Sequence, residues 1–194
     1  MLAFKSLVSV KSHMLQKICA FIYFRLLGWS VVGEPPTEKK YLFVVVPHTS
    51  NWDFIYGWLA LTALELEVKI FAKDIFFTWP LNYVCNWFGV LPVNRRRSTN
   101  FVDSVASMFE TRETLAAVIT PEGTRGYQPT LKSGYYHLAK KAKVPIVVAG
   151  PDFKNKKFSI VPPRAPLKTF EEDEANLIEF CREQVAKEKG HSFR

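Results

Sequence analysis

The sequence predicts a single α/β domain, with a mixed β-sheet flanked by helices, preceded by an N-terminal interfacial helical segment. Short runs of β-branched and aromatic residues alternate with stretches in which apolar residues recur at helical spacing. The chain has 194 residues, 48% of them hydrophobic and 14% aromatic, a composition that excludes a disordered or fibrous protein. This length fits one domain with a substantial core, so we expect one functional site.

The N-terminal stretch at residues 14–32 is strongly apolar, but Lys17 and Arg25 interrupt it. These charges leave fewer uninterrupted apolar residues than the roughly 20 that a membrane-spanning helix requires. The next residues, GEPPTEKK, form a polar linker without a small-residue cleavage site, which disfavours a signal peptide. We predict a membrane-associating helical segment at residues 1–34 and the α/β domain at residues 35–194. An ordinary core helix is the alternative interpretation of the segment.

The first predicted strand is the continuous apolar run YLFVVV at residues 41–46. Such a run fits a buried strand better than an amphipathic helix. His48 follows just beyond the end of this strand. Asn51 or Asp53 is expected to cap the next helix, which runs towards Glu65.

The rest of the chain continues the alternation of strands and helices. In chain order we predict a strand at 68–72, a helix around 101–109, a strand at 117–120, a helix at 131–141, and strands at 144–150 and 157–161. The last helix begins at a capping box formed by Thr169 and Glu172. Its apolar face comprises Leu177, Ile178, Cys181 and Val185, and Lys187 and Lys189 suit its C-terminal end.

The formal net charge of +8 and the pI of about 9.4 call for an acidic partner. Nucleic acid, anionic lipid headgroups and phosphorylated small molecules all qualify. The sequence shows no RNP, helix-turn-helix or zinc-finger pattern, so we predict no nucleic-acid partner. Cys19, Cys85 and Cys181 lie far apart without metal-ligand spacing, which predicts buried thiols and no metal site.

Five positions separate His48 from Asp53 in the segment PHTSNWDF. On a continuous α-helix this spacing would turn the two side chains about 140° apart. They can meet if His48 lies in the turn after its strand and Asp53 lies in the first turn of the helix. The carboxylate would then hold the imidazole in one tautomer and stabilise its protonated form, which makes His48 a general base. The alternative is a histidine that bonds the turn backbone, with Asp53 as a helix cap.

Two later segments carry groups suited to a phosphorylated ligand. In GVLPVNRRR, Gly89 and Pro92 shape a turn, and Arg95, Arg96 and Arg97 supply planar donors suited to bidentate phosphate contacts. In TPEGTRG, residues 122–125 emerge at the C-terminal end of a strand, which is where α/β sheets bind ligands. The respective alternatives are a solvated basic loop and an ordinary glycine-centred turn.

Taken in order, HxxxxD, GxxPxxR, PEGTR and a VPI strand resemble the pattern of the glycerophospholipid acyltransferase family over roughly residues 40–150. The resemblance implies transfer of a fatty acyl group from acyl-CoA or acyl carrier protein to a lysophospholipid, typically 1-acylglycerol 3-phosphate, without a metal or other cofactor. By position, His48 would be the base and Asp53 its partner. The acceptor's phosphate and glycerol site would comprise Arg95, Glu122, Gly123, Thr124 and Arg125. Lys73 would belong to the segment that lines the acyl-chain entrance.

The chain departs from the family pattern near the acceptor site. Pro47 stands where many members carry Asn, Gly126 replaces a common Ser, and Asn94 stands where an acidic residue often precedes the arginine. These changes keep open a sub-branch that acts on another lysolipid or a non-phosphorylated acceptor. A catalytically silent lipid-binding protein is a further alternative, although binding alone would require neither His48 nor Asp53.

The proposed chemistry places the enzyme at a membrane surface, where a soluble thioester meets a lipid acceptor. His48 would take the proton of the acceptor hydroxyl as it attacks the thioester carbonyl, with no acyl-enzyme. Ser50 lies outside a GxSxG turn, which disfavours serine catalysis. Seven lysines could hold the cleft against an anionic bilayer: Lys132, Lys140, Lys141, Lys143, Lys154, Lys156 and Lys157. We therefore expect peripheral or monotopic association with the cytoplasmic face of a membrane.

Overall fold

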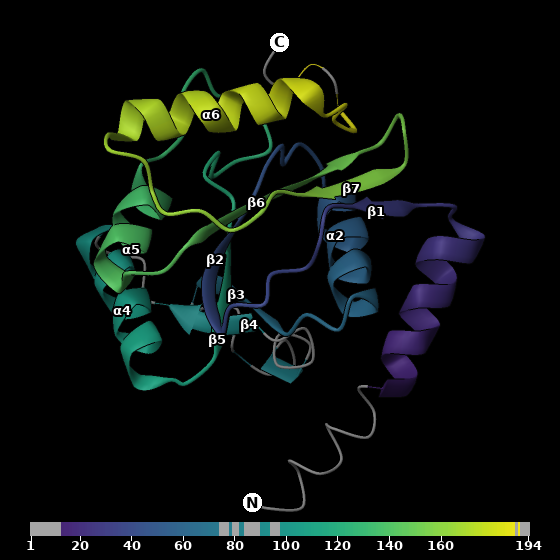
Figure 1. Cartoon of the computed structure of the whole chain (residues 1–194), viewed down its shortest axis with the longest axis horizontal. Coiled ribbons are helices and arrows are strands. Elements are labelled where there is room, and N and C mark those ends of the chain that lie inside the picture. The colour runs from purple at the N-terminus through teal and green to yellow at the C-terminus, as the bar shows by residue number, and fades with distance from the viewer. Residues whose placement is uncertain are drawn as a thin grey trace, which may run out of the picture.

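Seven strands form one mixed β-sheet in the order β1-β7-β6-β2-β5-β3-β4 within the residues that the computed structural model describes, namely 13–73, 78, 82–83, 90–93, 98–188 and 190 (Figure 1). The strands are β1 (Ser30–Val32), β2 (Lys40–Val45), β3 (Val68–Lys73), β4 (Val90–Val93), β5 (Leu115–Ile119), β6 (Ile146–Asp152) and β7 (Lys157–Ile160). Neighbouring strands run parallel except β6 and β7, which are antiparallel. The predicted α/β fold with a mixed sheet is confirmed.

Helices cover both faces of the sheet and one of its ends (Figure 1). α2 (Asn51–Ala63) and the N-terminal helix lie on one face, and α4 (Ser98–Thr111) and α5 (Gly134–Ala142) lie on the other. α6 (Phe170–Glu183) crosses the end of the sheet. The N-terminal helix comprises residues 13–20 and the π-helical turn η1 (Phe21–Leu26). It leads into β1, so the predicted N-terminal segment contributes a strand to the sheet.

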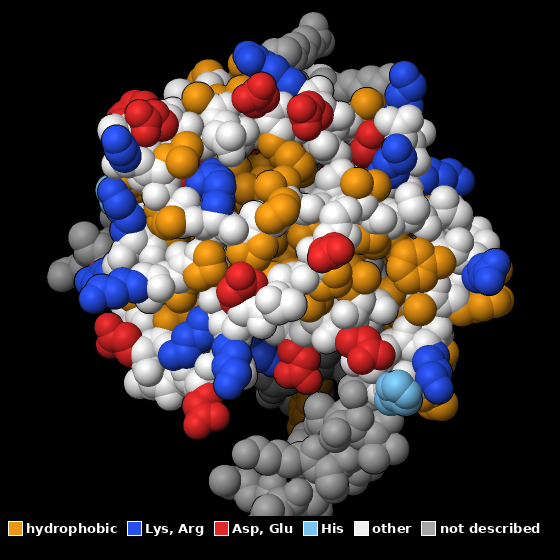
Figure 2. All heavy atoms as spheres, viewed as in Figure 1, with side chains coloured by type: hydrophobic (Ala, Val, Ile, Leu, Met, Phe, Trp, Pro, Cys, Tyr) orange, Lys and Arg blue, Asp and Glu red, His pale blue; other side chains and the backbone are white. Residues whose placement is uncertain are grey.

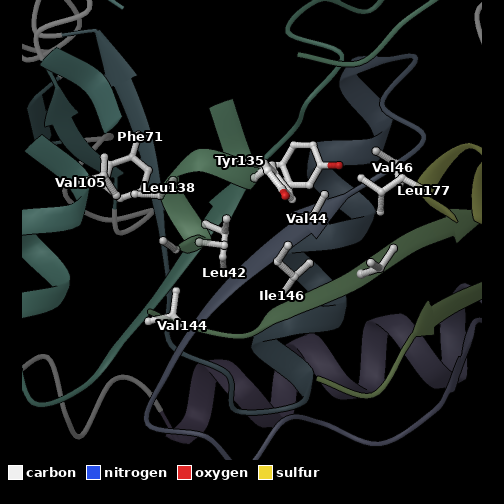
Figure 3. Packing of buried hydrophobic residues seen from close by; sticks show 14 of the residues in the cluster. Leu42, Val44, Val46, Phe71, Val105, Tyr135, Leu138, Val144, Ile146 and Leu177 are labelled. Carbon is white, nitrogen blue, oxygen red and sulfur yellow. The ribbon is translucent and has the colours of Figure 1, made fainter. Parts of the chain in front are cut away.

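After Lys40, β2 consists of apolar residues, which are buried on both faces of the strand. Successive side chains point to opposite faces of a strand. Leu42, Val44 and Val46 pack in one core cluster with side chains from α4, α5 and α6, including Val105, Leu138 and Leu177 (Figure 3). Tyr41, Phe43 and Val45 pack in a second cluster with Tyr23 of η1 and Leu61 of α2. Full burial of an aliphatic side chain of this kind contributes roughly 1.5–3 kcal/mol, so both faces of β2 hold it at the centre of the sheet.

Three details of the sequence prediction are wrong. Ser50 caps α2, rather than Asn51 or Asp53, and its hydroxyl accepts a hydrogen bond from the backbone N–H of Trp52 at 3.1 Å. Pro92 lies within strand β4 rather than in a turn, which is tolerated because β4 is at the edge of the sheet. α6 ends at Glu183 because Gln184 is extended, so Val185 and Lys187 lie beyond the helix. Lys189 lies outside the described residues.

α6 is joined to the rest of the domain by Asp173, whose side chain is fully buried. The Arg164 guanidinium donates two hydrogen bonds to the Asp173 carboxylate, at 2.8 and 3.0 Å. The same carboxylate accepts from the hydroxyl of Tyr135 at 3.1 Å and from the backbone N–H of Leu167 at 2.8 Å. This network ties α6 to α5 and to the chain after β7.

Candidate active site

Two of the predicted motifs meet at the carboxyl end of the central strands. β2 and β5 are parallel neighbours, so their carboxyl ends lie at the same edge of the sheet. The chain turns through His48 after β2, and through Glu122 after β5. The backbone N–H of His48 donates to Oε2 of Glu122 at 2.7 Å. The edge therefore brings together residues that lie 74 positions apart in the chain.

Asp53 holds the turn between β2 and α2 together. It is the third residue of α2, and its buried carboxylate accepts hydrogen bonds from the backbone N–H groups of Thr49 and Ser50. With Ser50 as the cap, this is a capping box. Nδ1 of His48 lies 3.4 Å from the same oxygen, Oδ2, of Asp53. Asp53 therefore shapes the helix terminus and faces the imidazole at once.

The imidazole of His48 remains partly accessible. Its side chain is 18% exposed, whereas that of Asp53 is 1% exposed. With Nδ1 directed at Asp53, Nε2 is the nitrogen left to accept a proton from a bound hydroxyl group. A carboxylate beside Nδ1 favours the imidazolium that forms when Nε2 takes this proton. The arrangement is suited to general-base chemistry on an alcohol.

Glu122 is buried beside this turn and carries a perturbed pKa. Burial raises the pKa of Glu122 to about 7; the hydrogen bond and the charge of His48 oppose this rise, and the charge of Asp53 adds to it. Its second oxygen, Oε1, is buried without a hydrogen-bond partner among the described residues. A buried polar atom in this state is unfavourable by about 1–3 kcal/mol.

The rest of the PEGTR motif forms a closed loop at the same edge. Gly123 adopts the left-handed conformation, with φ at +68°, and its N–H donates to the carbonyl of Thr120 at 3.2 Å. Arg125 is exposed in this loop. The base of the loop is closed by a hydrogen bond from the N–H of Lys132 to the carbonyl of Pro121, at 2.9 Å. Oε1 of Glu174 in α6 anchors the loop further by accepting from the N–H of Leu131 at 2.6 Å.

For one of the predicted site residues the structure describes the backbone alone, and others lie outside the described residues. Lys73 is the last residue of β3, whose carboxyl end shares the edge because β3 is parallel to β5. The side chain of Lys73 lies outside what the structure describes, as do Arg95 and Cys85. Cys19 and Cys181 are buried free thiols. In the described part of the chain, no group of three or more His, Cys, Asp or Glu side chains could hold a metal ion.

A cavity of about 390 Å³ opens elsewhere, at the amino ends of the strands. Its lining includes Lys39 and Tyr41 at the start of β2 and Leu115 at the start of β5, and contains none of the predicted site residues. In α/β sheets the ligand site lies at the carboxyl ends of the strands. We therefore place the candidate site around His48 and not in this cavity.

Two contacts of the site were not predicted from the sequence. Glu122 was expected at the acceptor, and its hydrogen bond from the backbone of His48 was not foreseen. Thr49 was not predicted either, although its buried hydroxyl oxygen accepts from the N–H of Glu188 at 3.3 Å, 139 positions away. No local signal could reveal either contact. The cap at Ser50, by contrast, was readable, because Ser50 and Asp53 have the spacing of a capping box.

Comparisons with known proteins identify the family of the chain. A model of the Acyltransferase family matches residues 29–150. The chain is 36% identical over 135 residues to human 1-acyl-sn-glycerol-3-phosphate acyltransferase beta, covering 66% of this chain and 48% of that protein. It is 28% identical over 151 residues to the 1-acyl-sn-glycerol-3-phosphate acyltransferase of Saccharomyces cerevisiae, covering 71% of this chain and 49% of that protein. The chain thus spans about half the length of the curated relatives that it matches.

A solved structure shares the fold. The crystal structure of the 1-acyl-sn-glycerophosphate (LPA) acyltransferase PlsC from Thermotoga maritima superposes with a TM-score of 0.57 at 17% identity, covering 91% of this chain and 81% of that one. The family match covers more than half of the chain and includes His48, Asp53 and residues 122–125. The resemblance predicted from the motifs is confirmed, and the chain belongs to the Acyltransferase family.

Proposed function

We propose that this chain transfers a fatty acyl group from acyl-CoA or acyl carrier protein to the free hydroxyl of a lysophospholipid such as 1-acylglycerol 3-phosphate. The observation that carries the proposal is the meeting of His48, Asp53 and Glu122 at one edge of the sheet. The names of the curated relatives support the choice of acceptor. The proposed chemistry uses side chains of this chain alone and requires no metal or other cofactor.

In the proposed reaction, Nε2 of His48 takes the proton of the acceptor hydroxyl while the hydroxyl oxygen attacks the thioester carbonyl carbon. The new C–O bond forms, the C–S bond breaks, and the imidazolium of His48 returns its proton to the departing thiolate. Asp53 stabilises the imidazolium during this step. The products are an ester and a free thiol, and no acyl-enzyme forms. General-base catalysis of this kind contributes about 10²–10⁴-fold to the rate.

The first test is thiol release from palmitoyl-CoA in detergent micelles, with and without 1-acylglycerol 3-phosphate. We expect release that depends on the acceptor, because water competes poorly with an alcohol held beside His48. A monoacylglycerol supplied in place of the phosphorylated acceptor separates the two acceptor classes. Release that proceeds equally without an acceptor would mean hydrolysis and contradict the proposal. Absence of release with every acceptor, and with acyl carrier protein as donor, would favour a silent lipid-binding protein.

We also propose that the N-terminal helix binds the membrane surface. One side of this helix is buried in the domain through Cys19 and Tyr23. Its other side exposes large apolar side chains: Met14, Ile18, Phe21, Phe24 and Leu26. Figure 2 shows hydrophobic, lysine and arginine side chains over this helix, at the right of the view. Among the described residues, no helix has the length and apolar character needed to span a bilayer.

Replacing two of these side chains should weaken membrane binding. Phe21 and Leu26 are 57% and 67% exposed, so Phe21→Ser with Leu26→Ser removes apolar surface without opening the core. We expect roughly tenfold weaker sedimentation with vesicles of phosphatidylcholine and phosphatidylserine, because interfacial binding scales with the buried apolar area. Val32→Ser, at a 47% exposed position in edge strand β1, is the control. Equal binding of the double variant and the wild type would refute this role of the helix.

A further inference from the structure

The side chain of Lys132 packs over Gly123, the glycine of the PEGTR motif. A Cβ atom built on Gly123 would lie 2.5 Å from Nζ of Lys132, 2.9 Å from Cε and 3.0 Å from Cδ. The lysine stem therefore runs directly over the Gly123 backbone, in the space that the missing side chain leaves free. The N–H of Lys132 also closes the base of the loop through the carbonyl of Pro121. The position of this ammonium group is thus set by the loop that carries Glu122 and Arg125.

The charge of Lys132 is not neutralised by the described part of the protein. Lys132 and Arg125 are both exposed, and neither has a carboxylate partner within 4.0 Å among the described residues. Two lysines of the neighbouring helix α5, by comparison, have partners: Lys141 forms an ion pair with Asp103, and Lys140 donates to the hydroxyl of Tyr136. Two exposed cations without a carboxylate partner, carried by the same closed loop, are suited to binding an anion such as a phosphate group.

We infer that Lys132 is a further binding residue of this site and that its ammonium group contacts the phosphate of a phosphorylated acceptor. A phosphate monoester carries a charge of about −1.5 to −2 at neutral pH, which the guanidinium group of Arg125 alone does not balance. The stem of Lys132 already lies along Gly123, so less side-chain freedom is lost on binding than for a free surface lysine. The inference rests on the proposed function and makes that function specific for phosphate-bearing acceptors.

The test measures binding of a short-chain 1-acylglycerol 3-phosphate, used below its micelle concentration, by isothermal titration calorimetry. Lys132→Met removes the charge and keeps the stem over Gly123, and Lys132→Arg restores a cation. We expect Lys132→Met to raise Kd roughly 10- to 100-fold, because hydrogen bonds to charged groups are strong, and Lys132→Arg to recover most of the affinity. Lys39→Met is the matched control, because Lys39 is exposed at the opposite end of β2 from His48. An unchanged Kd in Lys132→Met, or no binding by the wild type, would overturn the inference.

Two further measurements distinguish this inference from a role of Lys132 at the bilayer surface and from the proposed function itself. Binding to phosphatidylserine vesicles should be unchanged in Lys132→Met; a loss confined to vesicles would assign the lysine to the bilayer surface and overturn the inference. The ratio of kcat/KM for the phosphorylated acceptor to kcat/KM for a short-chain monoacylglycerol should fall in Lys132→Met, since only the first acceptor carries the phosphate. Lys132-dependent binding without acyl transfer to any acceptor would refute the proposed function and leave the phosphate site standing. Acyl transfer to the phosphorylated acceptor at the wild-type kcat/KM in Lys132→Met would refute the phosphate contact of Lys132 and leave the proposed function standing.

Discussion

Replacing His48 with alanine is expected to lower acceptor-dependent thiol release by roughly 10²- to 10⁴-fold, the contribution typical of a general base. The backbone N–H of residue 48 still reaches Glu122 in the variant, and Asp53 still holds the backbone of the turn. The loss should therefore fall on kcat, with little change in the acceptor concentration needed for half-maximal rate. Steady-state kinetics with palmitoyl-CoA at equal folded concentration measures both quantities.

The matched control for this variant is His137→Ala. His137 is exposed on α5, so its replacement removes an imidazole away from the site and should leave the rate within about twofold of wild type. Thermal unfolding of both variants is the check that they are folded. A His48→Ala protein that keeps acceptor-dependent release near the wild-type rate would rule out His48 as the base.

Replacing Asp173 with alanine is expected to destabilise the domain by about 3–5 kcal/mol, because removing one partner of a buried ion pair leaves the other uncompensated. Arg164 would lose two charge-assisted hydrogen bonds, and Tyr135 and the Leu167 N–H would lose their acceptor. Urea denaturation followed by tryptophan fluorescence measures the free energy of unfolding. Glu171→Ala, at an exposed position in the first turn of the same helix, should cost less than about 1 kcal/mol.

The contribution of Asp173 to the free energy of unfolding should also depend on pH. Burial alone would raise the pKa of this carboxyl group, but the hydrogen bonds from Arg164, Leu167 and Tyr135 outweigh it and hold the pKa below its usual value. A lowered folded-state pKa stabilises the protein above the pKa of an unfolded aspartate, about 3.9, and the stabilisation is lost as pH falls through the folded-state pKa. The stability difference between wild type and Asp173→Ala should therefore shrink below about pH 4. A difference that grows on acidification would contradict this account.

Most of the fold follows from patterns of a few neighbouring residues. A continuous apolar run such as YLFVVV is typical of a strand buried on both faces, and it predicts β2. Apolar residues at helical spacing predict α4. β1 and β4 were not predicted: β1 has only three residues, and β4 contains a proline. Their pairing with β7 and β3 supplies the hydrogen bonds that define them.

The sequence by itself pointed to His48, Asp53 and Glu122, and it allowed His48 to meet Asp53, because the end of a strand and the start of a helix lie close together in the chain. The tertiary structure alone decided that Glu122 supports the backbone of His48, that Thr49 accepts from Glu188, and that Lys132 lies over Gly123. These contacts depend on which strands become neighbours and on where α6 crosses the sheet. Both are set by the packing of two cores built from distant parts of the chain, and no local pattern encodes them.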